Sequence, residues 1–443
     1  MASDQKSAAN QHGPPYALTM MPLPLILAVA MRKIRWAAVT GLLMIVAIRG
    51  SAAATCQNNG SFSDWLGGVK QEALSQAVTP ETVRAALDGI TFNPAIVALD
   101  RRQGVFQQSF LQFSDRMVNS NRLDKGARLI QKHGTLFERI EREYGVPAPV
   151  LVALWGLESD FGLSGAKFQT LRALATLAYD CRRPSEFRPQ LLDALRVIDR
   201  GDLKPSEMVG EWAGELGPMR FPPSDYYEFA VDYDGDGRRD LINSVPDMLA
   251  STAALFANWG WRRGEPWLQE VRVPLDLPWD QADLSIQLPR SQWAQWGVRL
   301  VDNGRLPADD LPASLLLPMG YRGPTFLAYH NFRAYLRWNQ AMVYSTTAAY
   351  LSTRLAGAPP VRRGSGAVVP LNSRQIMTLQ QLLVKQGYLS GEVDGKLGRA
   401  TRASVRSAQL ALGFPADSYP TLELFDQLQA KERPTLKPNI DGR

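Results

Sequence analysis

Cysteine and histidine are scarce in this chain, and its basic residues form no run. The 443 residues include 2 Cys and 3 His, and these lack the clustered spacing that binds zinc. Lys and Arg number 49 against 43 Asp and Glu, which gives a net charge of +6. Because the basic residues are scattered, they predict a weak attraction to an anionic surface and not a nucleic-acid interface. No zinc cofactor and no nucleic-acid partner are therefore expected.

An apolar run of membrane-spanning length is also lacking. The run at 36–48 falls short of the roughly 20 residues that cross a bilayer. Basic residues precede it and the small residues 51–54 follow it, which is the layout of a secretory signal. We therefore expect residues 1–54 to be a leader, with its true start at Met31, and the protein to be exported to the periplasm. The alternative is an uncleaved anchor in the inner membrane that also uses the apolar run at 16–31.

The two cysteines have a simple interpretation in an oxidising compartment. Cys56 follows the predicted cleavage site, and Cys181 lies in the main domain. An isolated pair in an exported protein favours a disulfide, which here ties down the mature N-terminus. Lipidation of Cys56 is the alternative. It usually needs a large aliphatic residue three positions earlier and a small residue just before, where Ala53 and Thr55 stand.

The composition, with 45% hydrophobic and 21% charged residues, is that of a globular protein large enough for two domains. Helical periodicity dominates residues 62–263. Short β-like pieces broken by Pro and Gly follow at 267–326, and helical pattern then returns. The chain is therefore expected to be mainly α with a small β-containing insertion.

A linker and a second compact domain follow. Residues 358–370 ("APPVRRGSGAVVP") are rich in Pro, Gly and Arg and have no periodicity, which is typical of a linker. Residues 371–430 carry their own set of apolar positions, and 431–443 form a tail. The sequence therefore predicts a separate small domain at the C-terminus.

One carboxylate stands in an apolar setting in "ALWGLESDFG". A helix over 148–159 would place Leu151, Leu154 and Glu158 on one stripe, with Trp155 beside the carboxyl. Such a carboxyl is desolvated, so its pKa rises and it keeps its proton near neutral pH, as a general acid requires. The alternative is a buried structural glutamate that is paired with an arginine elsewhere.

Four motifs follow one another in the chain: "GVPAPVLVALWGLESDFG", "LRALATLAYDCRR", "GEWAGELGPMRFPPSDYYEFAVDYDGDGRRDLINSVPDMLAS" and "NFRAYLRWNQAMVYSTTAAYLS". Together they resemble the B-type lytic murein transglycosylases over residues 60–356. The resemblance implies a lysozyme-like catalytic domain at 57–357 that cleaves peptidoglycan glycan strands between N-acetylmuramic acid and N-acetylglucosamine. It further implies that Glu158 acts alone, first as acid and then as base, without a catalytic cofactor. The C6 hydroxyl of the muramoyl residue would then attack C1 and leave a 1,6-anhydro end.

The same resemblance implies the residues that bind the sugar. The stretch "EWAGELGPMRFPPS" corresponds to the family pattern "SxAGxxGxxQFMPS", with Phe221 as an aromatic of the cleft. Further along, the family's aromatic–Asn–Tyr cluster matches three residues of "LRWNQAMVY", which are Trp338, Asn339 and Tyr344.

This sequence departs from the family pattern at charged positions. Arg220 stands where the family has a glutamine, Pro222 replaces an apolar residue, and Glu211 replaces a small hydroxyl residue. Arginine keeps the donors of the amide but loses its acceptor, and its charge could meet a lactyl or peptide carboxylate of the substrate. Glu215, in the same stretch, is expected to be a loop residue without a chemical role.

The stretch "DYDGDGRRDLIN" resembles a calcium-binding loop. Asp232, Asp234 and Asp236 occupy positions 1, 3 and 5, and Gly237 the turn position. Arg238 would offer its backbone carbonyl, and the remaining expected ligands are Asp240 and Asp247, the latter because Asn243 stands where the usual bidentate Glu would be. The resemblance implies a structural Ca²⁺ here; a solvated acidic turn is the alternative.

The C-terminal stretch "LLVKQGYLSGEVDGKLGRATRASVRSAQ" resembles the small three-helix peptidoglycan-binding domain. Its "DGKLGRAT" turn is expected to cap the next helix through Thr401. The stretch "PADSYPT" departs from the family pattern because it lacks the usual "DG" turn. A protein-interaction domain is the alternative, but pairing with a wall-cleaving domain favours wall binding.

Three functions are left open by these residues. The first is an exported lytic transglycosylase with a wall-binding domain, and other cell-wall enzymes are conceivable partners. The second is a non-catalytic wall-binding scaffold, which the departures at Glu211, Arg220 and Pro222 suggest. The third is a hydrolytic muramidase, in which water replaces the C6 hydroxyl as the nucleophile.

Overall fold

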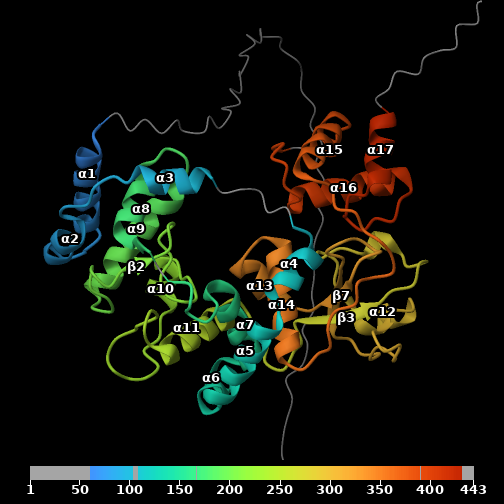
Figure 1. Cartoon of the computed structure of the whole chain (residues 1–443), viewed down its shortest axis with the longest axis horizontal. Helices are drawn as coiled ribbons and strands as arrows, with labels where there is room; N and C mark the ends of the chain where they lie inside the picture. The colour runs from blue at the N-terminus through green and yellow to red at the C-terminus, as the bar shows by residue number, and fades with distance from the viewer. Residues whose placement is uncertain (1–59, 103–107, 166, 390, 432–443) are drawn as a thin grey trace, which may run out of the picture. The chain divides into compact units, whose positions relative to one another are not determined.

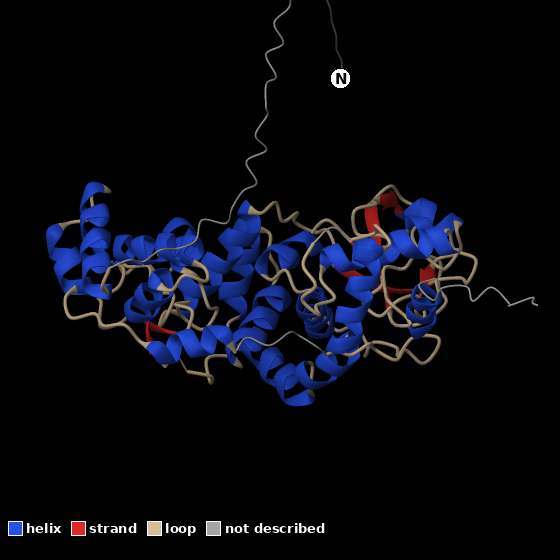
Figure 2. Ribbon diagram, turned by 90° about the horizontal axis from the view of Figure 1, so that it is seen from above, coloured by secondary structure: helices blue, strands red, loops and turns tan. Residues whose placement is uncertain are grey.

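The computed structural model describes residues 60–102, 108–165, 167–389 and 391–431. The predicted leader, Cys56 and the tail from residue 432 onward lie outside them. Helices dominate the part of the chain that the structure describes, and the strands gather in one region apart from a short pair (Figures 1 and 2). The prediction of a mainly α protein with a small β-containing insertion is confirmed.

The helices of the main domain fall into three groups along the chain. The first group contains α1 (Phe62–Ser75), α2 (Pro80–Leu87), α3 (Pro94–Arg101), α4 (Phe110–Met117), α5 (Ser120–Lys132) and α6 (Gly134–Tyr144). The second contains α7 (Ala148–Ser159), α8 (Thr170–Tyr179), α9 (Pro184–Asp199), α10 (Pro223–Phe229) and α11 (Val245–Asn258). The third contains α13 (Phe332–Trp338) and α14 (Met342–Leu355). One apolar core extends through all three groups.

The insertion is an antiparallel sheet with its own core. Its strand order is β4-β6-β7-β3-β5, and a second core cluster that includes the buried Trp293 packs on it. The elements are β3 (Leu268–Arg272), the short 3-10 helix η1 (Trp279–Gln281), β4 (Leu288–Pro289), α12 (Arg290–Gln295), β5 (Arg299–Leu300), β6 (Pro312–Leu316) and β7 (Thr325–Ala328). A separate two-stranded pair joins β1 (Phe168–Gln169) and β2 (Val209–Gly210).

The C-terminal domain has the predicted three helices, α15 (Ser373–Lys385), α16 (Arg399–Leu412) and α17 (Leu422–Ala430), around a third core cluster. The prediction that Thr401 caps α16 is wrong. The N-cap of α16 is Gly398, without a side-chain hydrogen bond. Thr401 instead donates to the carbonyl of Lys396 and accepts from Gln380, because it is buried and faces the turn.

The predicted linker at 358–370 contains no helix or strand, but it is bound to the main domain at several points. The Val361 amide donates to the Tyr350 hydroxyl at 3.0 Å, and Arg363 forms an ion pair with Asp115 at 2.8 Å. These contacts fix the course of this segment without regular structure.

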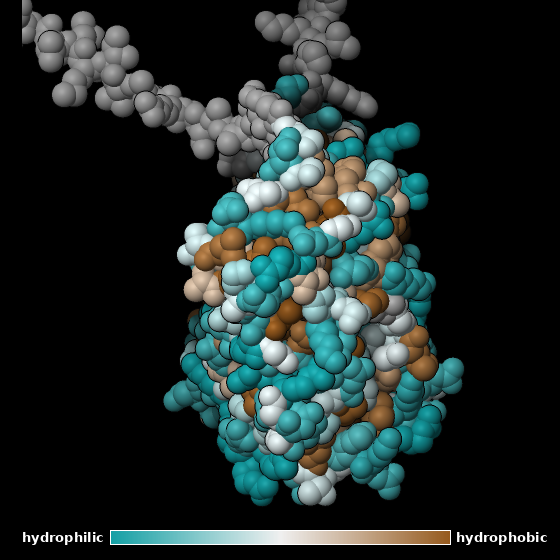
Figure 3. Space-filling model, turned by 90° about the vertical axis from the view of Figure 1, so that its left-hand side faces the viewer, coloured by the Kyte–Doolittle hydropathy of each residue, from teal (hydrophilic) through white to brown (hydrophobic). Residues whose placement is uncertain are grey.

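The surface of the described residues is mixed in character. In the face drawn in Figure 3, hydrophobic residues are interspersed with hydrophilic ones. A hollow of about 350 Å³ lies between α1 and α9, where Glu72 pairs with Arg188.

None of the helices in the described ranges combines the length and apolar content that a membrane crossing requires.

Candidate active site

Glu158 is the only charged residue of α7, a helix that is buried on nearly every side. The predicted bounds of this helix are confirmed. It packs against α5 and α14, as expected of a helix that is apolar all round. The side chain of Glu158 stays 12% exposed, so the carboxyl sits at the edge of the core.

The chain turns sharply directly after Glu158. Asp160, Phe161 and Gly162 have φ angles of 50°, 61° and 82°, a left-handed run that is costly for residues other than glycine. The turn folds Phe161 back onto Trp155, edge to face at 6.0 Å. Gly156 leaves room for this ring, because a Cβ there would lie 2.8 Å from it. The strained turn thus closes the end of α7 beside the carboxyl.

Two side chains that lie far from Glu158 in the sequence donate hydrogen bonds to one of its oxygens. The indole Nε1 of Trp338, at the end of α13, donates to Oε1 at 2.7 Å. The hydroxyl of Tyr344, in the first turn of α14, donates to the same oxygen. The structure therefore brings Trp338 and Tyr344, two residues of the predicted cleft, into contact with Glu158 and leaves Oε2 for other contacts. Their binding of sugar stays a prediction.

Burial is the dominant influence on the Glu158 carboxyl, and it raises its pKa above the usual range. The hydrogen bonds from Tyr344 and Trp338 and the charge of Arg220 act in the opposite direction. Burial also raises the pKa of Tyr344, so its hydroxyl remains a donor at neutral pH. A carboxyl in this setting keeps its proton more readily than one in water.

Arg220 reaches Glu158 from a pair of tight turns. Leu216 and Phe221 exchange backbone hydrogen bonds of 2.8 Å in both directions, and Arg220 sits between them with a φ of 55°. Its Nε lies 3.8 Å from Oε2 of Glu158. The Nε of Arg220 is buried and has no hydrogen-bond partner, so Arg220 and Glu158 form an ion pair without a hydrogen bond.

Two of the predicted sugar-binding residues have other surroundings. Phe221 is 1% exposed and packs edge-on against Trp338 at 6.0 Å, so the expectation that it lines the cleft is wrong. It supports the indole instead. Asn339 accepts a hydrogen bond from the Ala341 amide at 2.9 Å, which shapes the turn between α13 and α14.

Two acidic residues of the same turns were not predicted to belong to this site. Glu211 lies 3.5 Å from Nη2 of Arg220. Burial raises the pKa of Glu215, and the charges of Arg220, Glu211 and Glu158 act on it as well. The glycines around them were the available signal, because tight turns fold such a stretch back on itself.

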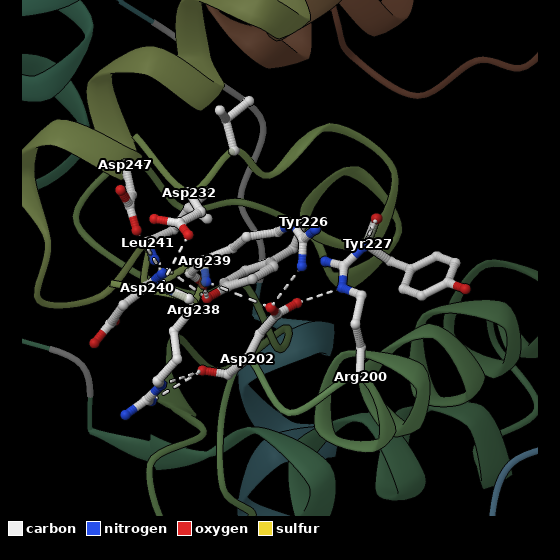
Figure 4. Close-up of polar contacts among 12 residues, drawn as sticks. Arg200, Asp202, Tyr226, Tyr227, Asp232, Arg238, Arg239, Asp240, Leu241 and Asp247 are labelled. Carbon is white, nitrogen blue, oxygen red and sulfur yellow. Dashed lines mark hydrogen bonds and ion pairs between the residues drawn. The ribbon is translucent and has the colours of Figure 1, made fainter. Parts of the chain in front are cut away.

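The predicted calcium loop brings three carboxylates together. Oxygens of Asp232, Asp234 and Asp247 all lie within 4.8 Å of one another. Gly237 has a φ of 91° at the turn position, as the loop pattern requires. Asp247 thus joins the loop from the start of α11, as expected from the missing glutamate at position 243 (Figure 4).

The other predicted ligands lie outside this group of three. Asp236 accepts from the Arg238 amide at 2.8 Å. Asp240 accepts from the amides of Ile242 and Asn243 at 3.0 and 2.9 Å. Backbone amides also donate to Asp232, from Gly235 and Gly237 at 2.8 and 2.9 Å, so it is the spacing of the oxygens, and not these hydrogen bonds, that sets the group of three apart.

A buried aspartate anchors this loop to the rest of the domain. Asp202 is 1% exposed and pairs with Arg200 and with Arg239, the latter at 3.1 Å. Its backbone carbonyl accepts from the guanidinium of Arg238 at 2.9 and 3.1 Å (Figure 4). These hydrogen bonds fix the side chain of Arg238. They do not involve its backbone carbonyl, which is the predicted ligand atom.

Cys181 is disulfide-bonded. Cys56, the other cysteine of the sequence, lies outside the described residues, so the predicted pairing stays a prediction.

The chain is similar to known families and to a curated protein. Residues 61–353 match the family described as "Transglycosylase SLT domain", and 372–428 match "Putative peptidoglycan binding domain". The chain is 28% identical over 196 residues to membrane-bound lytic murein transglycosylase B of Escherichia coli (strain K12), which covers 44% of this chain and 53% of that protein. It therefore spans about half the length of this relative.

Among solved structures, SltB3 from Pseudomonas aeruginosa, in complex with NAG-anhNAM-pentapeptide, has a TM-score of 0.78 and 38% identity, and the match covers 83% of this chain and 99% of that one. The Escherichia coli lytic transglycosylase Slt35 in complex with calcium has a TM-score of 0.57 and 24% identity, with 68% of this chain and 97% of that one covered. The second likeness concerns the fold alone.

Proposed function

The chain belongs to the transglycosylase SLT domain family, and from this premise we propose that it is a lytic transglycosylase of peptidoglycan. It would cleave the β-1,4 bond between N-acetylmuramic acid and N-acetylglucosamine and leave a 1,6-anhydromuramoyl end. One observation carries the proposal: the carboxyl of Glu158 is desolvated at the end of α7 and receives two side-chain donors on one oxygen.

In the first step, Glu158 acts as a general acid. Because Trp338 and Tyr344 both donate to Oε1, the proton of the acid form belongs on Oε2. It passes to the glycosidic oxygen while the bond from that oxygen to C1 of the muramoyl residue breaks. The N-acetyl group of the substrate assists at C1.

In the second step, the ionised Glu158 acts as a base. It takes the proton of the muramoyl C6 hydroxyl, whose oxygen forms the new bond to C1. The donors from Trp338 and Tyr344 and the nearby charge of Arg220 stabilise the carboxylate in this interval. An internal nucleophile has a high effective molarity, so this route requires neither a second protein carboxylate nor a catalytic cofactor.

The calcium loop would have a structural role. Three carboxylates within 4.8 Å form the hard oxygen donor set that Ca²⁺ prefers, and Asp232, Asp234 and Asp247 would hold the ion. None of them contacts Glu158, so the ion would stabilise the loop and take no part in the chemistry.

The C-terminal domain would bind the glycan strands of the wall. A weak binder joined to the catalytic domain raises the effective concentration of an insoluble substrate. Together with the predicted leader, wall binding supports the proposal that the protein acts in the periplasm.

Digestion of purified peptidoglycan followed by mass analysis of the products tests the proposal. Anhydro-muropeptides are the expected result. Reducing ends would identify a hydrolytic muramidase, and the absence of any product over the whole pH range would identify a non-catalytic scaffold. Either of the latter outcomes would overturn the proposal.

A further inference from the structure

Two charged residues that distinguish this chain from its family's sequence pattern contact each other beside Glu158. Glu211 and Arg220 lie nine positions apart in the sequence, and Oε1 of the first is 3.5 Å from Nη2 of the second. Both are partly exposed, at 25% and 38% of their side chains. The two departures therefore form one ion pair.

The backbone fixes both residues at their positions. The Glu211 amide donates to the Glu215 carbonyl at 3.0 Å, and the Arg220 amide donates to the Gly217 carbonyl at 3.0 Å. Gly217 is closely packed here, because a Cβ would lie 2.3 Å from the Leu241 carbonyl oxygen. The turns therefore have little freedom to move, and only the side chains can change the distance between Arg220 and Glu158.

Arg220 stands close enough to Glu158 to pair with it, but it forms no hydrogen bond to it. Its Nε lies 3.8 Å from Oε2 and has no other partner. Oε2 is the oxygen that must carry the transferred proton, because Oε1 already receives two donors. A closer, charge-assisted contact from the guanidinium would occupy this oxygen and favour its ionised form.

We propose that Glu211 is a positioning residue that holds the Arg220 guanidinium to one side of Glu158, so that Oε2 stays free to release and recover its proton. The inference rests on the proposed function of Glu158 as acid and base. Arg220 would then supply positive charge for the ionised interval without trapping the carboxylate.

The charged and titratable groups around Glu158 are few among the described residues. Tyr344 faces it from α14, and Arg220, Glu211 and Glu215 face it from the turns at 209–221. From α5, Arg122 and Lys125 bind Asp160 instead, at 3.2 Å in each case. The position of the Arg220 guanidinium between Glu211 and Glu158 is therefore the feature that can change the electrostatic potential at Oε2.

The pH profile of anhydro-product release by full-length Glu211→Gln tests the inference. With Arg220 freed to pair with Glu158, the alkaline limb of kcat/KM should move to lower pH by about one unit, and activity above that limb should fall about tenfold. Glu81→Gln, which breaks the exposed ion pair with Arg84 on α2, is the matched control and should keep the wild-type profile.

The same substitution in an Arg220→Gln background separates positioning from direct charge effects. Arg220→Gln alone should move the limb to higher pH, and adding Glu211→Gln should then shift it far less than in the wild-type background. An equal shift in both backgrounds, or no shift with Arg220 present, would overturn the inference. If Glu211→Gln fails to fold, an unchanged limb in Arg220→Gln would overturn it as well.

Failure of the proposed function has a different signature. In that case the wild-type protein would release no anhydro product at any pH. Failure of the inference alone would leave the wild-type protein active and the profile of Glu211→Gln unaltered.

Discussion

Glu158 and Asp247 are both carboxyl groups whose pKa is raised by burial, but their hydrogen bonds differ. Asp247 is fully buried and accepts from three backbone amides, those of Tyr233, Asp234 and Asp240, through both of its oxygens. Glu158 receives side-chain donors on one oxygen only. Backbone donors on both oxygens fix a carboxylate in place, whereas a free oxygen allows a proton to come and go. Asp247 is therefore arranged as a structural acid, whereas Glu158 is arranged for proton transfer.

The largest expected effect separates the two acids by activity. Glu158→Gln keeps the shape and both hydrogen bonds of the side chain but removes the acid and the base. Anhydro-product release should fall by about a thousandfold or more, within the range ascribed to general acid–base catalysis. The measurement is the initial rate on purified peptidoglycan, with the melting temperature as a check on folding.

Glu141→Gln is the control for this substitution, because Glu141 is an exposed residue of α6. It should retain the full rate. Wild-type activity in Glu158→Gln would contradict the assignment of the catalytic carboxyl.

A smaller effect is expected from the donors to Glu158. Tyr344→Phe removes a hydrogen bond that lowers the pKa of Glu158, so this pKa should rise and the alkaline limb of the pH profile should move to higher pH. The rate of the second step should fall by about ten- to a hundredfold, because a hydrogen bond to a charged group contributes about 1.5–3 kcal/mol. The measurement is the pH dependence of kcat/KM together with kcat.

Tyr335→Phe is the matched control, because that buried hydroxyl donates to Ser352 at 2.7 Å and does not contact Glu158. It should change the melting temperature and leave the pH limb in place. If the limb moved equally in Tyr335→Phe and Tyr344→Phe, the shift could not be assigned to the hydrogen bond between Tyr344 and Glu158.

The sequence predicted the parts of this site that depend on local pattern. Helix α7 and its carboxyl follow from a continuous apolar run that contains one charge. The donors could be named only through the resemblance, because Trp338 and Tyr344 lie 180 and 186 residues from Glu158, and no local periodicity reveals such contacts. Phe221 was misplaced because a sequence does not distinguish an aromatic that binds sugar from one that supports its neighbour.

The pair of Glu211 and Arg220 was visible only as two separate departures. Their contact depends on two successive tight turns and on a left-handed φ at Arg220, neither of which its residue type favours. In the acidic loop, by contrast, the position of Asp247 beside Asp232 and Asp234 was predicted, because the loop pattern itself requires a further ligand.

The structural acids should respond to calcium and not to substrate. Calcium at about 100 times its Kd should stabilise the folded protein by about 2.7 kcal/mol, which is a rise of a few degrees in melting temperature. Asp234→Asn should lose most of this rise, because Asp234 belongs to the group of three carboxylates. Asp236→Asn, the control outside that group, should retain it, and an equal loss in both would contradict the ligand assignment.

The smallest expected effect is that of calcium removal on catalysis. A chelator should lower the melting temperature but leave kcat and the pH limb of the folded protein unchanged, because Asp232, Asp234 and Asp247 have no contact with Glu158. The measurement is the rate well below the melting temperature, with and without the chelator. A fall in kcat while the protein remains folded would link the two acidic sites.

Digestion in water enriched with heavy oxygen tests the central claim most directly. If Glu158 passes its proton to the leaving oxygen and then takes that of the C6 hydroxyl, no oxygen of water reaches C1. The products should be unlabelled and one water lighter than hydrolysed muropeptides. Heavy oxygen at C1 would contradict the account, because it would show that water, not the sugar's own hydroxyl, attacks.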